Sequence, residues 1–248
     1  IGLLVTFLGV AMSVPIAVDL WAGSGNAGVF FEAAAITVLV GLSLTLSCAN
    51  SAGGRLTLQQ TFLITTGVWL ALPVFGALPF FLGVDGEPYV NAFFEAMSGL
   101  TTTGSTVLTN LVGKPPGLLL WRSMLQWFGG IGIIVVAMVF LPELRIGGMQ
   151  IFRSEGFDTF GKILPRAQAI ATRRSVIYIT LTGTCAIAYA AFGMSPFDAI
   201  THAMTTLATG GFSNYDLSFA AFGRGVEYTA VVFMILAALP FVRYVQML

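Results

Sequence analysis

Two fifteen-residue stretches decide the fold: AFFEAMSGLTTTGST at residues 92–106 and AITHAMTTLATGGFS at residues 199–213. They align without gaps at a constant spacing of 107 residues, which carries position 104 onto position 211. Six of the fifteen positions are identical: Ala92/Ala199, Ala96/Ala203, Met97/Met204, Leu100/Leu207, Thr102/Thr209 and Gly104/Gly211. Asn91 and Asp198 precede the two stretches and are residues of the N-cap type. Each stretch therefore predicts a short helix followed by an extended segment rich in threonine and glycine.

The composition is that of a membrane protein. Of the 248 residues, 56% are hydrophobic and only 9% are charged, and the mean hydropathy is +0.90. An ordinary soluble domain is about one quarter charged, so water is not the expected solvent. The formal net charge is zero, which gives no basic field for a nucleic-acid partner, and we expect none.

Apolar runs predict six membrane-spanning helices, because about 20 residues are needed to cross the hydrocarbon core. They lie at about 1–20, 29–48, 61–82, 118–141, 176–192 and 228–245. The two repeated stretches predict helices of about ten residues, at 91–100 and 198–207, which are too short to span the bilayer and are expected to be re-entrant. The expected fold class is therefore an all-α integral membrane protein.

The lysines and arginines of the short loops predict the orientation, because such residues accumulate on the cytoplasmic side. One expected side carries Arg55, Arg145, Arg153, Lys162, Arg166, Arg173 and Arg174. That side is predicted to be cytoplasmic, so both short helices would enter from outside.

Short re-entrant helices followed by Thr/Gly segments suit a cation filter. The negative end of each helix dipole would point into the membrane, where it favours a cation. Irregular backbone at that depth is tolerated when it lines a cavity, and rings of backbone carbonyls replace the hydration shell of K⁺ in filters. The alternative for a single Thr/Gly stretch is close helix packing. Its repetition at matched positions favours the filter.

Four motifs together resemble the TrkH family, the membrane subunit of bacterial Trk potassium uptake. They are LTTTGSTV at 100–107, LQWFGGIGII at 125–134, IGGMQ at 146–150 followed by RSE at 153–155, and ATGGFS at 208–213. The resemblance implies a bacterial inner-membrane protein with two N-terminal helices and four pore-loop repeats around one pseudo-fourfold pore. Residues 1–248 would hold the N-terminal helices and two repeats, which is half of the pore. Such a portion is not expected to conduct K⁺ alone.

The resemblance also implies a division of the chain and a set of site residues. Residues 1–57 would be two N-terminal transmembrane helices, 58–145 the first pore-loop repeat, 146–174 a cytoplasmic linker and 175–248 the second repeat. Gly104 and Gly211 would be the filter glycines. The residues expected to bind the ion or line the filter are Thr102, Thr103, Gly104, Thr209, Gly210 and Gly211, with K⁺ held by backbone carbonyls, in particular those of Thr102, Thr103, Thr209 and Gly210. The residues expected to support the filter are Thr101, Ser105, Phe212, Glu95 and His202.

Several polar and small residues carry two interpretations each. Glu95 and His202 occupy equivalent positions in the short helices. Each is interpreted either as an ion-path or pH-sensing group or as a hydrogen-bonded support of the helix. Arg122 either snorkels or pairs with a carboxylate. Gly129, Gly130 and Gly132 serve close helix packing or act as a hinge.

The function expected from the resemblance is K⁺ uptake without a cofactor, K⁺ being the transported ion. The alternatives are the channel-like subunit of a Kdp-type pump and a Ktr-type Na⁺ or K⁺ transporter. Expected partners are a cytosolic nucleotide-binding subunit resembling TrkA and a second copy of the chain. An enzyme is not expected, because His202 is the only histidine and no nucleophile has a base near it in the pattern.

Overall fold

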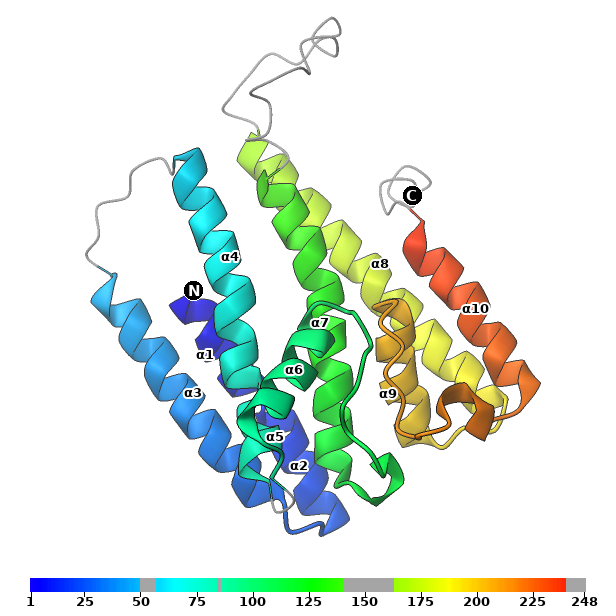
Figure 1. The fold of residues 1–248 in the computed structure, drawn as a ribbon. Helices are drawn as coiled ribbons and strands as arrows, with labels where there is room; N and C mark the ends of the chain where they lie inside the picture. Colours follow the sequence, from blue (N-terminus) through cyan, green and yellow to red (C-terminus); the bar gives the residue numbers. More distant parts are fainter. Residues whose placement is uncertain (50–56, 84–85, 141–162, 240–248) are drawn as a thin grey trace, which may run out of the picture.

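The computed structural model describes residues 1–49, 57–83, 86–140 and 163–239, and every regular element in these ranges is helical. The elements are α1 (Gly2–Ala11), α2 (Ser13–Ala22), α3 (Ala27–Ser47), α4 (Leu58–Gly76), α5 (Leu78–Leu82), α6 (Tyr89–Leu100), η1 (Leu111–Gly113), α7 (Pro116–Phe140), α8 (Ile163–Ala191), α9 (Pro196–Leu207), η5 (Ser218–Ala221) and α10 (Arg224–Ala238). They form one bundle in which the short helices α6 and α9 both pack against α7 (Figure 1). The predicted all-α class is confirmed for these ranges.

Each predicted span contains helix. The pair α1 and α2 forms the first, α3 the second and the pair α4 and α5 the third, and α7, α8 and α10 follow. The stretches Gly2–Ala22, Ala27–Ser47 and Phe62–Leu82 are long and apolar enough to cross a membrane, and Ser175–Ala191 is a shorter apolar helix. Large apolar side chains such as Trp21, which is 92% exposed, point outward from the bundle. Such exposure suits contact with lipid rather than with water.

The predicted N-caps of the short helices are wrong. Asn91 and Asp198 both lie inside the first turn, and the caps are Pro88 and Ser195. The Ser195 hydroxyl accepts a hydrogen bond from the Asp198 N–H at 3.1 Å, and Pro196 occupies the first helical position. Proline is favoured there because its φ is already helical and it has no N–H to leave unpaired. The helices therefore begin two residues earlier than expected.

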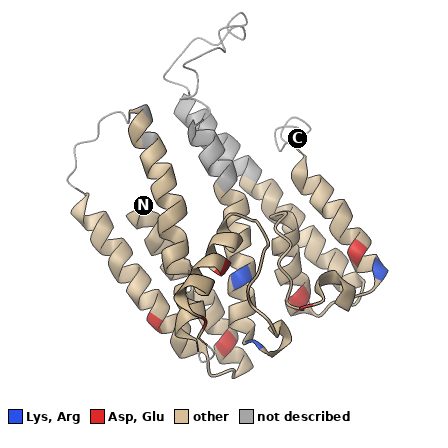
Figure 2. Ribbon diagram, in the orientation of Figure 1, with Lys and Arg blue, Asp and Glu red and all other residues tan. Residues whose placement is uncertain are grey.

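The charged side chains that Figure 2 colours gather in one half of the bundle. Figure 2 shows the acidic and basic residues in the half where α6 and α9 begin. Helix α8 begins at Ile163, so residues 163–174 of the predicted linker are helical. The rest of that linker lies outside the described residues, as do four of the basic residues behind the predicted orientation: Arg55, Arg145, Arg153 and Lys162.

Each short helix lies in an apolar core of its own. Around α6, the buried side chains of Phe30 and Trp121 join the N-terminal helices to α7, and the Trp121 indole donates a hydrogen bond to the Gly76 carbonyl at 2.9 Å. Around α9, buried Tyr178 and Tyr189 belong to α8, and α10 closes the other side. Helix α7 contacts both short helices, so it is the common support of the two repeated stretches.

A buried carboxylate fixes the start of α7. Asp19, at the end of α2, is 1% exposed and accepts a hydrogen bond from the Gly117 N–H at 2.8 Å. The Ser24 hydroxyl and the Asn26 amide also donate to it, at 2.8 and 3.3 Å. A carboxylate at this position satisfies a free N–H of the first helical turn and opposes the positive end of the helix dipole. Asp19 thus joins the N-terminal helices to α7.

Replacing Asp19 by alanine is expected to lower the free energy of unfolding by about 1–3 kcal/mol, because buried donors lose their acceptor. The thermal unfolding midpoint in detergent micelles measures this. Glu32→Ala is the matched control, since Glu32 is an exposed acid on the neighbouring helix α3. Equal midpoints for the two variants would contradict the assigned role of Asp19.

Candidate functional site

The backbone that follows α6 has the same hydrogen bonds as the backbone that follows α9. We call residues 101–106 the first Thr/Gly segment and residues 208–213 the second. In both, the first N–H groups turn back to the carbonyls at the end of the short helix. After α6, the N–H groups of Thr101, Thr102 and Thr103 donate to the carbonyls of Met97 (2.8 Å), Gly99 (2.9 Å) and Ser98 (2.9 Å). After α9, the N–H groups of Ala208, Thr209 and Gly210 donate to the carbonyls of Met204 (3.1 Å), Thr206 (2.9 Å) and Thr205 (3.0 Å).

The two segments also share an unusual backbone conformation. Thr102 and Thr209 both have φ of 55°, and Gly104 and Gly211 have φ of 80° and 75°. The left-handed region costs a residue with a side chain roughly 1–2 kcal/mol, so a threonine there is strained. Strain of this kind persists where the surroundings impose it, and it concentrates at functional sites. Left-handed residues therefore occur at the same two positions of both segments, so the two segments share one backbone structure.

The carbonyl oxygens of these segments are free of hydrogen bonds within the described part of the chain. None of the carbonyls at 102–104 and 209–211 accepts one there, although the N–H groups of residues 101–103 and 208–212 are engaged. The two segments approach closely, since a Cβ on Gly104 would overlap the Gly210 carbonyl oxygen. Thr103 and Thr209 are exposed, and Gly104, Gly210 and Gly211 are partly buried. The site therefore offers uncommitted carbonyl oxygens, next to the negative ends of α6 and α9.

A buried ion pair joins the two segments. Glu95 in α6 and Arg122 in α7 are 0% and 1% exposed, and their Oε1 and Nε atoms are 2.8 Å apart. The Thr106 hydroxyl donates to Glu95 at 2.9 Å, and Arg122 Nη1 donates to the Ser213 carbonyl at 2.8 Å. One guanidinium therefore bridges the first short helix to the second Thr/Gly segment. Of the two interpretations of Arg122, pairing with a carboxylate is the one observed.

Glu95 and His202 make equivalent contacts. The Val107 N–H donates to Glu95 Oε2 at 3.1 Å, and the Asn214 N–H lies 3.4 Å from His202 Nε2. Nε2 is also 3.0 Å from the Ser213 hydroxyl, just as Glu95 receives the hydroxyl at the equivalent position of the first segment. A carboxylate and a neutral imidazole nitrogen are both acceptors, which explains how two different residue types fill one structural position.

A second acid extends the network around His202. The Asp198 backbone carbonyl lies 2.8 Å from His202 Nδ1, so the ring proton resides on Nδ1 and leaves Nε2 as the acceptor. The Asp198 carboxylate accepts hydrogen bonds from the Asn214 amide at 2.9 Å and from the Tyr215 hydroxyl at 3.1 Å. Burial, together with the Asp198 carboxylate, raises the pKa of Tyr215, so the phenol keeps its proton at neutral pH. The chain after the second segment is thus pinned to α9.

The glycines of α7 allow it to lie between the two segments. A Cβ on Gly129 would overlap the Leu100 carbonyl at the end of α6, and one on Gly130 would lie 3.2 Å from the Cα of Ala208. Close packing is therefore confirmed for Gly129 and Gly130. For Gly132 no described residue lies within 4 Å of the Cβ position, so its packing role stays a prediction.

Three residues of this region had no predicted role. Gln126 is fully buried in α7 and its Oε1 accepts a hydrogen bond from the Phe212 N–H at 3.1 Å. Asn214 directly follows the second aligned stretch, and Asp19 lies in the first helix pair. For Gln126 and Asp19 the available signal was a polar group within an apolar run, because such groups are costly in a membrane and need partners. The partner of each becomes apparent only in three dimensions.

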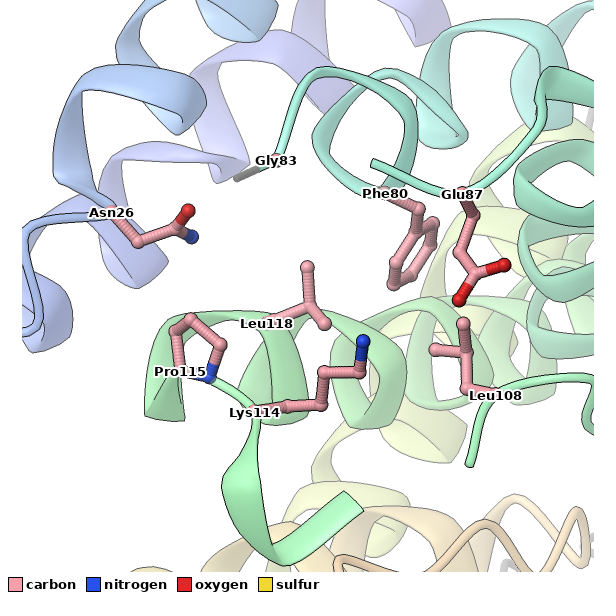
Figure 3. Close-up of a pocket in the computed structure, with 8 residues that line it drawn as sticks. All are labelled: Asn26, Phe80, Gly83, Glu87, Leu108, Lys114, Pro115 and Leu118. Atoms are coloured by element: carbon pink, nitrogen blue, oxygen red, sulfur yellow. The ribbon is translucent and has the colours of Figure 1, made fainter. Parts of the chain in front are cut away.

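A small cavity lies apart from the Thr/Gly segments, near the start of α7 (Figure 3). Its volume is about 40 Å³, which is room for very few water molecules. The side chains of Lys114 and Glu87 point into it in Figure 3. The cavity is too small for an organic ligand, so it does not compete with the segments as the candidate site.

Over the ranges that the structure describes, the chain is an all-helical integral membrane protein whose two short helices are each followed by a strained Thr/Gly segment. The chain belongs to the TrkH family, described as a cation transport protein, whose family profile matches residues 27–248. This confirms the resemblance seen in the sequence motifs.

Relatives of known identity agree with that assignment. The chain is 45% identical over 191 residues to the Trk system potassium uptake protein TrkI of Halomonas elongata, a match that covers 76% of this chain and 39% of TrkI. It is 39% identical over 245 residues to TrkH of the same organism, covering 97% of this chain and 51% of TrkH. The crystal structure of the potassium transporter TrkH from Vibrio parahaemolyticus superposes with a TM-score of 0.84 at 36% identity, covering 97% of this chain and 49% of that one. The chain spans about half the length, or less, of these relatives.

Proposed function

We propose that this chain serves K⁺ uptake across the bacterial inner membrane and that its two Thr/Gly segments are walls of the selectivity filter. The observation that carries the proposal is the set of uncommitted carbonyls at 102–104 and 209–211, on backbone with a repeated left-handed alternation. Carbonyl oxygens are the ligands that K⁺ filters use in place of water. The ion ligands we propose are the carbonyls of Thr102, Thr103, Gly104, Thr209, Gly210 and Gly211.

Two segments supply only part of a ring of carbonyls. We propose that further backbone of the intact protein completes the ring on the side where Thr103 and Thr209 are exposed. We also propose a division of the chain into N-terminal helices over 1–57, a first pore-loop repeat over 58–145, a linker over 146–174 whose last residues, 163–174, are the start of α8, and a second repeat over 175–248.

The remaining site residues act as supports in this proposal. Glu95 and His202 are fully buried and hydrogen-bonded to the backbone after each filter segment, which favours a holding role over a direct contact with the ion. Phe212 lies under the Arg122 guanidinium, with the guanidinium carbon 4.3 Å from its ring centroid. Thr101 and Ser105 flank the ligand carbonyls.

Two partners belong to the proposal. The relatives are named as parts of a Trk system, and we propose a cytosolic nucleotide-binding subunit similar to TrkA as the regulator and a second copy of the protein as the other subunit. K⁺ is the cargo, and the proposed transport needs no cofactor and no enzymatic step in this chain.

The test is ⁸⁶Rb⁺ uptake into bacteria that lack their own K⁺ uptake systems and express the intact protein. We expect saturable uptake that unlabelled K⁺ inhibits at least about tenfold more strongly than Na⁺. Cells with the empty vector give the background. Uptake no greater than that background, from protein that is present in the membrane, would contradict the proposed function.

A further inference from the structure

The side chain of Gln126 reaches from α7 to the backbone of the second Thr/Gly segment. It is fully buried, and its Oε1 accepts the Phe212 N–H at 3.1 Å. A Cβ added to Gly210 would overlap the amide group, which shows that the amide lies directly against that segment. Gln126 is thus the side chain that closes the space behind Gly210.

The amide also lies near the first segment. Its Nε2 is 3.8 Å from the position that a Cβ would take on Gly104, and 2.5 Å from the equivalent position on Gly210. This Nε2 is buried and makes no hydrogen bond among the described residues. The Phe212 N–H requires an acceptor, so the amide cannot rotate to exchange its oxygen and nitrogen without setting two donors against each other. Its NH₂ group therefore stays where the two segments meet.

A buried donor without a partner costs free energy, and each such group in a native structure calls for an explanation. The spacing of 107 residues carries position 126 onto Phe233 in α10, which is buried and apolar, so a helix that follows such a segment can hold an apolar side chain at this position. Among the described residues, only the second segment receives a side-chain acceptor from α7, so we assign the amide a role toward the segments rather than within the helix.

We propose that Gln126 is a specificity-determining positioning residue for cation selection, holding the second segment through the Phe212 N–H so that the carbonyls of Gly210 and Gly211 keep their place. This rests on the proposed function of the segments. If the acceptor is withdrawn, the segment is free to shift, and K⁺ loses ligands whose spacing discriminates it from the smaller Na⁺. Uptake continues with poorer discrimination.

The test compares the K⁺ over Na⁺ preference of variants of the intact protein, taken as the ratio of the Na⁺ and K⁺ concentrations that halve ⁸⁶Rb⁺ uptake. Gln126→Met removes both polar atoms at similar length, and we expect the preference to fall about three- to tenfold. Gln126→Glu keeps an oxygen for the Phe212 N–H, and we expect its preference to stay within about twofold of the wild type.

Ser123→Ala is the matched control. Ser123 lies one turn earlier on α7 and is buried, and among the described residues its hydroxyl bonds only to the Leu119 carbonyl of its own helix, at 3.1 Å. Its preference should equal that of the wild type. Should Gln126→Met not accumulate in the membrane, Gln126→Asn makes the same prediction, because it is one methylene too short to reach the Phe212 N–H.

An unchanged preference in Gln126→Met or Gln126→Asn overturns the proposal, and so does a Gln126→Glu variant that loses as much preference as the methionine. If either result occurs while the wild type and Ser123→Ala still show K⁺-selective uptake, the proposed function of the segments is not contradicted. Absence of uptake from both would instead count against the filter itself, so the two failures are distinguishable.

Discussion

Replacing Arg122 by methionine is expected to lower the free energy of unfolding by about 3–5 kcal/mol, the largest effect of any single change considered. The reason is that Glu95 would keep a buried charge without its partner, while the Ser213 carbonyl loses its donor. Because the guanidinium joins the first short helix to the second segment, ⁸⁶Rb⁺ uptake should fall with the stability.

The thermal unfolding midpoint of the purified variant in detergent, read beside uptake per amount of membrane protein, measures both effects. The double variant Glu95→Gln/Arg122→Met should recover a large part of the lost stability, since the glutamine still accepts from the Val107 N–H and carries no charge. Arg224→Met is the control, because Arg224 is an exposed arginine at the start of α10. A single Arg122→Met variant as stable as that control would show that the ion pair does not hold the site.

The second large effect is expected from Gly104→Ala, which should lower the K⁺ over Na⁺ preference by more than about tenfold. A Cβ at position 104 would overlap the Gly210 carbonyl oxygen, and the alanine would also have to adopt a φ of 80°. Gly211→Ala meets open space, with the Met234 side chain 4.0 Å away, so only the left-handed φ of 75° opposes it. That strain is roughly 1–2 kcal/mol. If it acts on ion selection, the K⁺ over Na⁺ preference of Gly211→Ala should fall by about tenfold at most.

Gly193→Ala is the matched control for these two glycines. It carries the same kind of strain, at a φ of 94° with nothing within 4 Å, but it lies in the turn between α8 and α9. We expect it to reduce stability slightly and leave the ion preference unchanged. Gly104 would serve packing rather than ion selection in either of two cases: if Gly104→Ala had the same K⁺ over Na⁺ preference as Gly193→Ala, or if its only effect were a smaller amount of folded protein.

Much of the fold followed from the sequence, because its signals are local. The apolar runs predicted six helical spans, and the repeat at a spacing of 107 residues predicted both short helices. The error at the N-caps was also local: Pro88 and Pro196 start the helices earlier than Asn91 and Asp198 suggested. Proline at a helix start is readable from sequence, and was the stronger signal.

The site was less predictable, because its decisive contacts join residues far apart in the chain. Arg122 reaches the Ser213 carbonyl across 91 positions and Gln126 reaches the Phe212 N–H across 86. The left-handed Thr102 and Thr209 oppose the ordinary preference of threonine, so no propensity predicts them. The helix ends that precede these threonines and the packing against α7 impose the conformation, and both exist only in the folded chain.

Whether the two Thr/Gly segments bind the ion is tested by anomalous diffraction from crystals of the intact protein soaked in Rb⁺, which replaces K⁺ at carbonyl sites. We expect anomalous peaks between the two Thr/Gly segments, in contact with the carbonyl oxygens of Thr102, Thr103, Thr209 and Gly210. The peaks should weaken when K⁺ is added at equal concentration and persist when Na⁺ is added instead. Rb⁺ bound elsewhere in the bundle, with no peak at these carbonyls, would contradict the assignment of the two segments as filter walls.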